Sequence, residues 1–294
     1  AVAMAGLFYD DAAWKKLAFC GLNRELDRQN SEDGVNLEMA THYQAFVMEA
    51  YGLLMLQPGT AHMTEGWKPR LTQMSRFLCD CCGAHGETAI FGDDDSGKIL
   101  DLGGRNVNDI HVVLQLMGCV LDEHDEPPCE TIRWLAAEEA QKKNVEKTRY
   151  CSPLVSVRRE GGYTILRSGD QAVLIALDHG PLGFGALAAH GHADALSIQA
   201  FRNGKKILTD PGTWNYHLCA NLRDLFRAET WHSTVYVTGQ PQSEMLGPFL
   251  WGRRAQTRLL DVQEDESGVT VCAQTKYGAI RHTRTLRFDK MRTL

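Results

Sequence analysis

The stretch LVSVRREGGYTILRSGDQAVLIALD, residues 154–178, decides the fold of the second half of this chain. Apolar and polar residues alternate along it, and GG and SGD interrupt the alternation. A period of two places successive side chains on opposite faces of a strand, so the stretch predicts antiparallel strands joined by short turns. Further strand-like runs follow at 195–201, 205–209, 232–238, 254–262, 268–274 and 280–288. The second half is therefore predicted to be all-β, most simply a sandwich of antiparallel sheets.

The residues before this stretch follow a helical period instead. In residues 36–56, apolar side chains recur at spacings of three and four. Other helices are predicted at 1–8, 11–29, 66–82, 105–120 and 129–143, with Gly-, Pro- or Asp-containing loops at 58–60, 92–97 and 125–128. Helical pairs in series predict stacked hairpins, as in a solenoid or toroid. We place a helical domain at 1–148 and a β-domain at 149–294, which makes this a multidomain α+β chain.

Composition excludes several classes of protein. The chain has 294 residues, of which 44% are hydrophobic and 23% charged, as in an ordinary globular protein with a sizeable core. The net charge is −6 and no basic block occurs, so nucleic acid is not an expected partner. No apolar run is long enough to predict a transmembrane helix. The nine irregularly spaced cysteines favour reduced thiols over a disulfide framework.

The two ends of the chain interrupt regular patterns. The sequence starts inside a helical pattern and stops inside an alternating strand, which we interpret as a fragment truncated at both ends. The N-terminus therefore predicts no localisation.

Three short motifs gather groups with the chemistry of a site. They are AAHGHADALS at 188–197, LTDPGT at 208–213 and TWHSTV at 230–235, and they contribute five such residues: His190, His192, Asp194, Asp210 and His232. Imidazole and carboxylate are ligands that zinc prefers, and imidazole is also the usual proton shuttle near neutral pH. An isolated HxH is a weak pattern, and DPGT is also an ordinary turn. The three motifs together predict a metal or catalytic site.

The same motifs resemble the heparinase II/III family of polysaccharide lyases. The resemblance runs through 177–197, 208–217, 223–244 and 247–255, and more loosely through 33–50 and 91–98. It implies a partial α/α toroid followed by an antiparallel β-sandwich, with a cleft between them. It further implies β-elimination on a uronic-acid polysaccharide and a periplasmic or secreted location. An anionic polysaccharide or oligosaccharide is the expected partner, and a homodimer is left open.

The resemblance also implies roles for individual residues. Tyr43, in EMATHY, matches the family's catalytic tyrosine, and His190 matches its catalytic histidine. Tyr216 is the candidate for a second tyrosine. The implied ligands of a structural Zn²⁺ are His192, Asp210 and His232. The residue pattern alone does not decide whether His190 or His192 is the ligand.

The chemistry of β-elimination sets requirements on these groups. A base must remove the C5 proton of a uronate, and an acid must protonate the leaving oxygen. A phenol has a pKa near 10, so cationic or donor neighbours are expected to lower the pKa of Tyr43 if it acts as the base. Arg223 and Arg227 are candidates for binding substrate carboxylate or sulfate, with a surface salt bridge as the alternative. The family's carboxylate-neutralising Asn precedes the first residue of this chain, so an incomplete cleft is expected.

Two other functions remain open from the sequence. The His and Asp residues could instead form an open zinc site for a hydrolase, or the chain could bind glycans without catalysis. Only elimination leaves a 4,5-unsaturated uronate, so the product separates a lyase from a hydrolase. Trp214, Trp231 and Trp251 are candidates for stacking on sugar rings, with core packing as the alternative. The loop at 92–97 is interpreted as an acidic turn in preference to a calcium loop.

Overall fold

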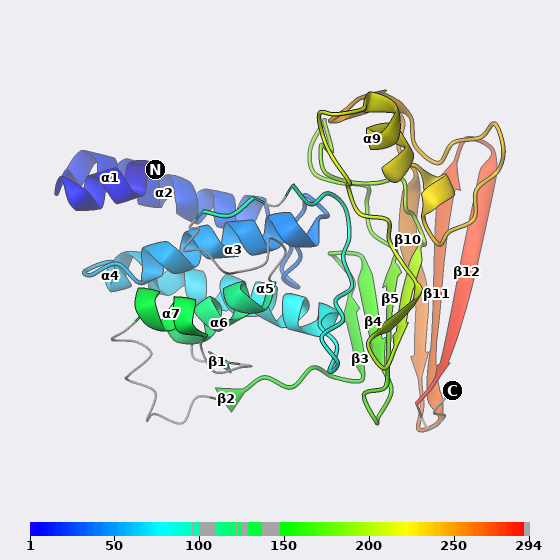
Figure 1. The fold of residues 1–294 in the computed structure, drawn as a ribbon, viewed down its shortest axis with the longest axis horizontal. Helices are drawn as coiled ribbons and strands as arrows, with labels where there is room; N and C mark the ends of the chain where they lie inside the picture. The colour runs from blue at the N-terminus through cyan, green and yellow to red at the C-terminus, as the bar shows by residue number, and fades with distance from the viewer. Residues whose placement is uncertain (96, 100–109, 122, 125–128, 137–147, 291–294) are drawn as a thin grey trace.

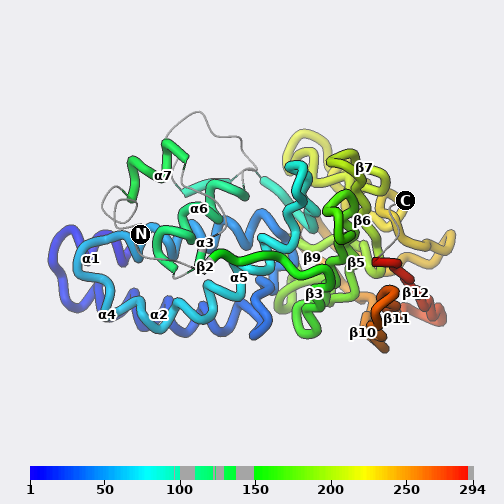
Figure 2. The backbone as a smooth tube through the Cα atoms, turned by 90° about the horizontal axis from the view of Figure 1, so that it is seen from below, coloured from blue at the N-terminus to red at the C-terminus, as the bar shows by residue number. Residues whose placement is uncertain are grey.

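The computed structural model describes residues 1–95, 97–99, 110–121, 123–124, 129–136 and 148–290. A helical half and a β half lie beside each other (Figure 1), and the view from below shows the same arrangement (Figure 2). The predicted class, with helices first and antiparallel sheets second, is confirmed. The domain boundary at 148/149 falls within β2 (Thr148–Arg149) and stays a prediction. Among the described helices, none is both long and apolar enough to cross a membrane.

The helical half consists of antiparallel helices around an apolar core. Its described elements are α1 Val2–Phe8, α2 Ala12–Arg28, α3 Thr41–Met55, α4 Ala61–Thr64, the 3-10 helix η1 Glu65–Trp67, α5 Lys68–Cys81, α6 Ile110–Val120 and α7 Glu130–Leu135. Helix α3 packs against α5 and α6, and Met48, Met74 and Met117 from these three helices are fully buried. The predicted helices at 105–120 and 129–143 extend into residues outside the described part.

Helix α3 begins at Thr41, five residues later than predicted. The preceding segment is folded by buried side-chain hydrogen bonds that compete with helix formation. Gln44 accepts the Asn36 N–H at 2.9 Å and donates to the Gly34 carbonyl at 2.9 Å. Met39 adopts φ 57°, which a right-handed helix does not allow. This places Thr41 and Tyr43 in the first turn of α3.

The β half contains two antiparallel sheets. The larger sheet has five strands in sequence order, β3 Val155–Arg158, β4 Tyr163–Arg167, β5 Val173–Asp178, β6 Ile198–Arg202 and β7 Lys205–Leu208. The smaller sheet has three, β10 Gln256–Glu264, β11 Gly268–Tyr277 and β12 Ile280–Asp289. Short pairs join β1 Glu123–His124 with β2, and β8 Met245–Gly247 with β9 Leu250–Trp251.

The two sheets pack face to face, as a sandwich requires. One buried cluster combines Leu166 and Leu177 of the larger sheet with Val271 and Phe288 of the smaller. Alternation along β11 and β12 turns one face of the smaller sheet toward this cluster. The structure therefore confirms the sandwich that the period-two pattern predicts.

The long connection between β7 and β8 differs from the prediction. It contains α9 Ala220–Phe226 and the 3-10 helix η2 Glu229–Trp231, neither of which we predicted. The strand predicted at 232–238 is wrong, because this segment makes only an isolated bridge between Val237 and Gln240.

A buried polar cluster fastens the two halves together. Asp80 of α5 is fully buried and accepts hydrogen bonds from the β half: Arg158 Nη2 at 2.6 Å, Ser156 Oγ at 2.6 Å and Tyr150 Oη at 2.9 Å. A carboxylate with three donors, one of them cationic, satisfies the condition for a buried charge. This fastening fixes the distance between the first turn of α3 and the β half.

Candidate active site and metal centre

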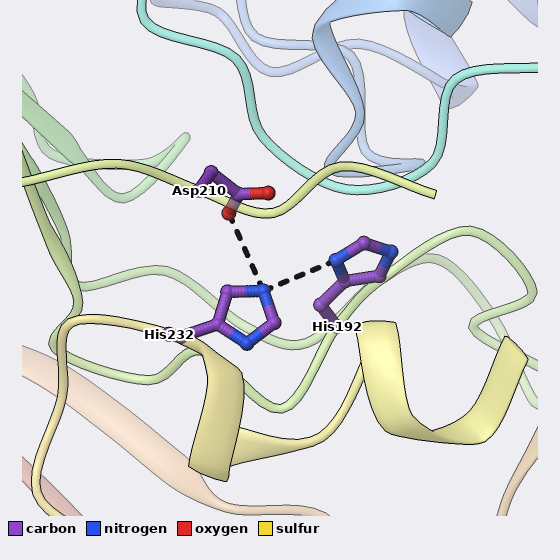
Figure 3. Close-up of side chains that lie close together, drawn as sticks. All are labelled: His192, Asp210 and His232. Atoms are coloured by element: carbon purple, nitrogen blue, oxygen red, sulfur yellow. Dashed lines mark hydrogen bonds and ion pairs between the residues drawn. The ribbon is translucent and has the colours of Figure 1, made fainter. Parts of the chain in front are cut away.

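Three predicted ligands converge inside the β half (Figure 3). His192 lies between β5 and β6, Asp210 follows β7, and His232 follows η2. His232 Nε2 is 3.2 Å from His192 Nδ1 and 3.3 Å from Asp210 Oδ2. One ligand atom from each residue lies within 4.8 Å of the others, and all three residues are buried. Two imidazole nitrogens and a carboxylate oxygen at this spacing fit a single metal ion.

Hydrogen bonds behind the histidines orient their lone pairs toward this point. His232 Nδ1 is 2.8 Å from the Ala228 carbonyl, so it donates its proton there and leaves Nε2 as the acceptor. His192 Nε2 is 2.9 Å from Asp93 Oδ1, which leaves Nδ1 facing the other two ligands. Such outer partners fix the tautomer of metal-binding histidines. Burial opposes the charged form of His232, but Asp210 outweighs it and raises its pKa to about 9.

Asp93 is the shared centre of the site, and the sequence did not single it out. Its side chain is fully buried, and Arg223 donates to both of its oxygens at 2.5 and 2.6 Å. It also accepts from His192 and from His190 Nδ1, the latter at 3.3 Å. Burial opposes the charge on Asp93, but the histidine hydrogen bonds and Arg223 outweigh it and lower its pKa. One carboxylate therefore positions both histidines of the HxH motif.

The structure brings the expected catalytic residues together at the junction of the two halves. The ring of Tyr43 stacks on His190 with centroids 3.7 Å apart and planes at 19°. The hydroxyls of Tyr43 and Tyr216 are 3.3 Å apart. Tyr43 Oη also donates to Asp95 Oδ2 at 2.9 Å. These contacts span 147 residues between Tyr43 and His190, and they create one group of proton-transferring side chains.

The electrostatics of the tyrosines differ from the expectation. Burial raises the pKa of Tyr43, and the hydrogen bond to Asp95 raises it further, while Tyr216 opposes this weakly. Burial also raises the pKa of Tyr216, with the nearby charge of Asp93 adding to the effect. The described surroundings therefore keep both phenols protonated. His190 directs its Nδ1 proton to Asp93, so its Nε2 carries a lone pair.

Arg223 and Arg227 are placed differently from the predicted substrate contact. Both side chains are fully buried. Arg223 is used by Asp93 and lies 4.9 Å from the Tyr216 ring centroid, while Arg227 donates to Asp224 and to the carbonyls of Gly247 and Pro248. A fully buried guanidinium with internal partners cannot contact a polysaccharide in this conformation. Both arginines instead support the site from behind.

The other predicted features are also placed. Trp251 is only 2% exposed and packs under Arg227, so it is a core residue and not a sugar-stacking one. Asp194 is buried beside the three ligands but is not one of the converging group. The described part of the loop at 92–97 joins the two halves: the Asp93 N–H donates to the His190 carbonyl at 2.9 Å, and the Asp94 N–H to Thr213 Oγ1 at 2.7 Å.

Comparison with known proteins gives a family for the β half. Residues 153–294 match the family model described as heparinase II/III-like, C-terminal. No curated protein matches the chain. Among solved structures, heparinase III is similar with a TM-score of 0.70 and 16% identity, over 98% of this chain and 44% of that one. The heparan sulfate lyase HepC of Pedobacter heparinus has a TM-score of 0.68 and 17% identity, over 96% of this chain and 40% of that one.

These likenesses cover both halves of the chain. They support the predicted fold of helical hairpins from a toroid followed by a β-sandwich. The chain spans less than half the length of each of the two solved structures.

Proposed function

Because residues 153–294 form a heparinase II/III-like C-terminal domain, we propose that this chain is part of a polysaccharide lyase that cleaves a uronic-acid-containing glycan by β-elimination. The observation that carries the proposal is the meeting of Tyr43, His190 and Tyr216 at the junction of the halves. Residues from two domains gain nothing structurally from sharing hydroxyl and imidazole groups at one place. A reaction that needs an acid and a base at one sugar ring requires such a meeting.

The reaction needs one proton acceptor and one proton donor. In β-elimination the C5–H and C4–O4 bonds break and a C4=C5 double bond forms, while O4 leaves with a proton. His190 Nε2, with its free lone pair, suits removal of the C5 proton. The protonated hydroxyls of Tyr43 and Tyr216 suit donation to O4, since their pKa values are raised. Asp93 holds His190 in the tautomer that this assignment requires.

The proposed metal is a structural Zn²⁺ held by His192 Nδ1, His232 Nε2 and the Asp210 carboxylate. The metal would supply rigidity, because it links three segments that are distant in sequence. The ligands are 1%, 7% and 8% exposed, in the order His192, His232, Asp210. A zinc hydrolase needs a ligand position open to water and substrate, so this burial favours the lyase over the hydrolase.

The test is the product formed from a panel of uronate polymers, including heparan sulfate, chondroitin sulfate and alginate. Full-length protein should release an unsaturated uronate that absorbs in the near ultraviolet. The matched control is Tyr51→Phe, which removes a tyrosine hydroxyl bonded to the Leu22 carbonyl within the helical half. Loss of product in Tyr43→Phe but not in Tyr51→Phe supports the site. Reducing ends without the absorbance would contradict β-elimination.

A further inference from the structure

Three aromatic side chains lie together beside the site, on the connection between β7 and β8. Trp214 follows the turn at 210–213, Phe226 ends α9 and Trp231 ends η2. The ring centroids of Trp214 and Phe226 are 6.3 Å apart with planes at 28°, and those of Phe226 and Trp231 are 5.0 Å apart with planes at 33°. We call these three residues the aromatic row.

The aromatic row is exposed where other aromatic residues of the chain are buried. Trp214 is 52% exposed and Trp231 is 46% exposed, whereas Trp67 and Trp251 are each 2% exposed. Single exposed apolar residues are ordinary, but adjoining large rings on a surface mark binding sites. The exposure therefore separates the row from the tryptophans that serve the core.

The backbone at Trp214 adds an independent sign. Trp214 has φ 60°, in the left-handed region that bulky residues rarely adopt because of steric cost. Such a cost persists only where the surroundings impose it, and strained residues gather at functional sites. Here the strain is not compensated by burial of the indole, since half of the residue faces solvent.

The aromatic row adjoins the proposed reacting centre. Thr213, directly before Trp214, accepts the Asp94 N–H and contacts Asp93 at 3.3 Å. Tyr216, two residues after Trp214, has its hydroxyl 3.3 Å from that of Tyr43. Two residues of chain span at most about 7 Å. A glycan held at Tyr43 and Tyr216 is therefore within reach of Trp214.

We propose that the aromatic row is a sugar-binding subsite, which stacks on a ring of the glycan next to the ring that is cleaved. The proposal rests on the proposed function for the class of ligand. A pyranose presents a face of C–H groups, and an indole face complements it while the polar edge of the sugar stays in water. The row supplies affinity without charge, so recognition of the carboxylate remains with the catalytic group.

Oligosaccharide binding tests this subsite separately from turnover. Binding of heparan sulfate, chondroitin sulfate and alginate oligosaccharides of increasing length is measured by calorimetry, in a Tyr43→Phe background so that the probe is not consumed. Trp214→Ala and Trp231→Ala should each weaken the Kd by about 5- to 30-fold for the longer oligosaccharides. Trp231→Phe should retain most of the affinity because it keeps an aromatic face. The control Trp134→Ala, at a 78% exposed tryptophan of α7, should change nothing.

The outcomes separate the subsite from the reaction. Tryptophan variants that bind like Trp134→Ala would overturn the subsite, even if the wild type releases unsaturated product. Binding that depends on Trp214 and Trp231 without any unsaturated product would support the subsite and refute the lyase. Wild-type protein that binds none of the probes would overturn the subsite. A self-associating dimer that the tryptophan variants abolish, with oligosaccharide binding unchanged, would also overturn it.

Discussion

Asp93→Asn is the substitution that most sharply probes how the site is held together. The change keeps the shape of the side chain but removes its charge, and it places an amide N–H₂ where donors now converge. Arg223 would then be left fully buried with no carboxylate against its two terminal nitrogens. Removing one partner of a buried ion pair typically costs about 3–5 kcal/mol, because the remaining charge stays desolvated. We expect a loss of this size in the free energy of unfolding.

The chain offers a matched control for this loss. Asp224 also pairs with a fully buried arginine, Arg227, but its carboxylate is 51% exposed. Arg227 keeps the carbonyls of Gly247 and Pro248 when that carboxylate is replaced. Asp224→Asn should therefore cost less than about 1 kcal/mol. The comparison isolates burial of the pair from its chemistry.

Urea unfolding of both variants measures the difference. A lower midpoint at unchanged m-value in Asp93→Asn reports lost stability of the native state. Zinc affinity, measured by competition with a chelator, should also fall by about 10- to 100-fold, because His192 loses the acceptor that fixes its tautomer. If Asp93→Asn unfolds at the same urea concentration as Asp224→Asn, Asp93 does not hold the site and the reasoning fails.

Other substitutions test the assigned roles. Tyr43→Phe should lower turnover by about 10²- to 10⁴-fold with little change in substrate affinity, measured by steady-state kinetics; unchanged turnover would remove Tyr43 from the mechanism. His190→Ala should lose turnover but keep zinc, whereas His192→Ala should lose zinc by elemental analysis; equal zinc loss in both would refute the division of roles. Burial lowers the pKa of His179 to about 4, so its neutral form favours the folded state above pH 6.5 and this contribution is lost as the pH falls toward 4. His179→Gln should therefore reduce the loss of unfolding free energy over that range by up to about 3 kcal/mol, and urea titrations with equal slopes against pH would contradict this.

Local patterns predicted the elements whose side chains obey one period. The alternation at 154–178 became β3, β4 and β5, because each strand buries side chains of both its faces in a predictable way. The alternation at 232–238 did not become a strand. There His232 turns inward toward Asp210 and not toward a sheet, and Thr234 donates to the Ala195 carbonyl. A period of two cannot distinguish a strand from a loop whose inward residue serves a metal site.

The candidate site was predictable only where its residues lie close in sequence. The HxH motif and its two partners stood out as a group because they fall within forty-three residues, 190–232. Asp93 did not, since its partners His190, His192 and Arg223 lie 97, 99 and 130 residues away. Arg223 and Arg227 looked suited to a substrate because a sequence carries no information on burial of a short helix. Long-range packing of the two halves decided these positions.

The mass balance of the products tests the central claim most directly. Full-length protein is incubated with a uronate oligosaccharide of defined length, and all products are weighed by mass spectrometry. Elimination moves a proton and breaks C4–O4 without adding water, so we predict product masses that sum to the mass of the substrate. The same products should be absent with Tyr43→Phe. Product masses that exceed the substrate by one water would show hydrolysis and contradict the assignment of Tyr43, His190 and Tyr216 to β-elimination.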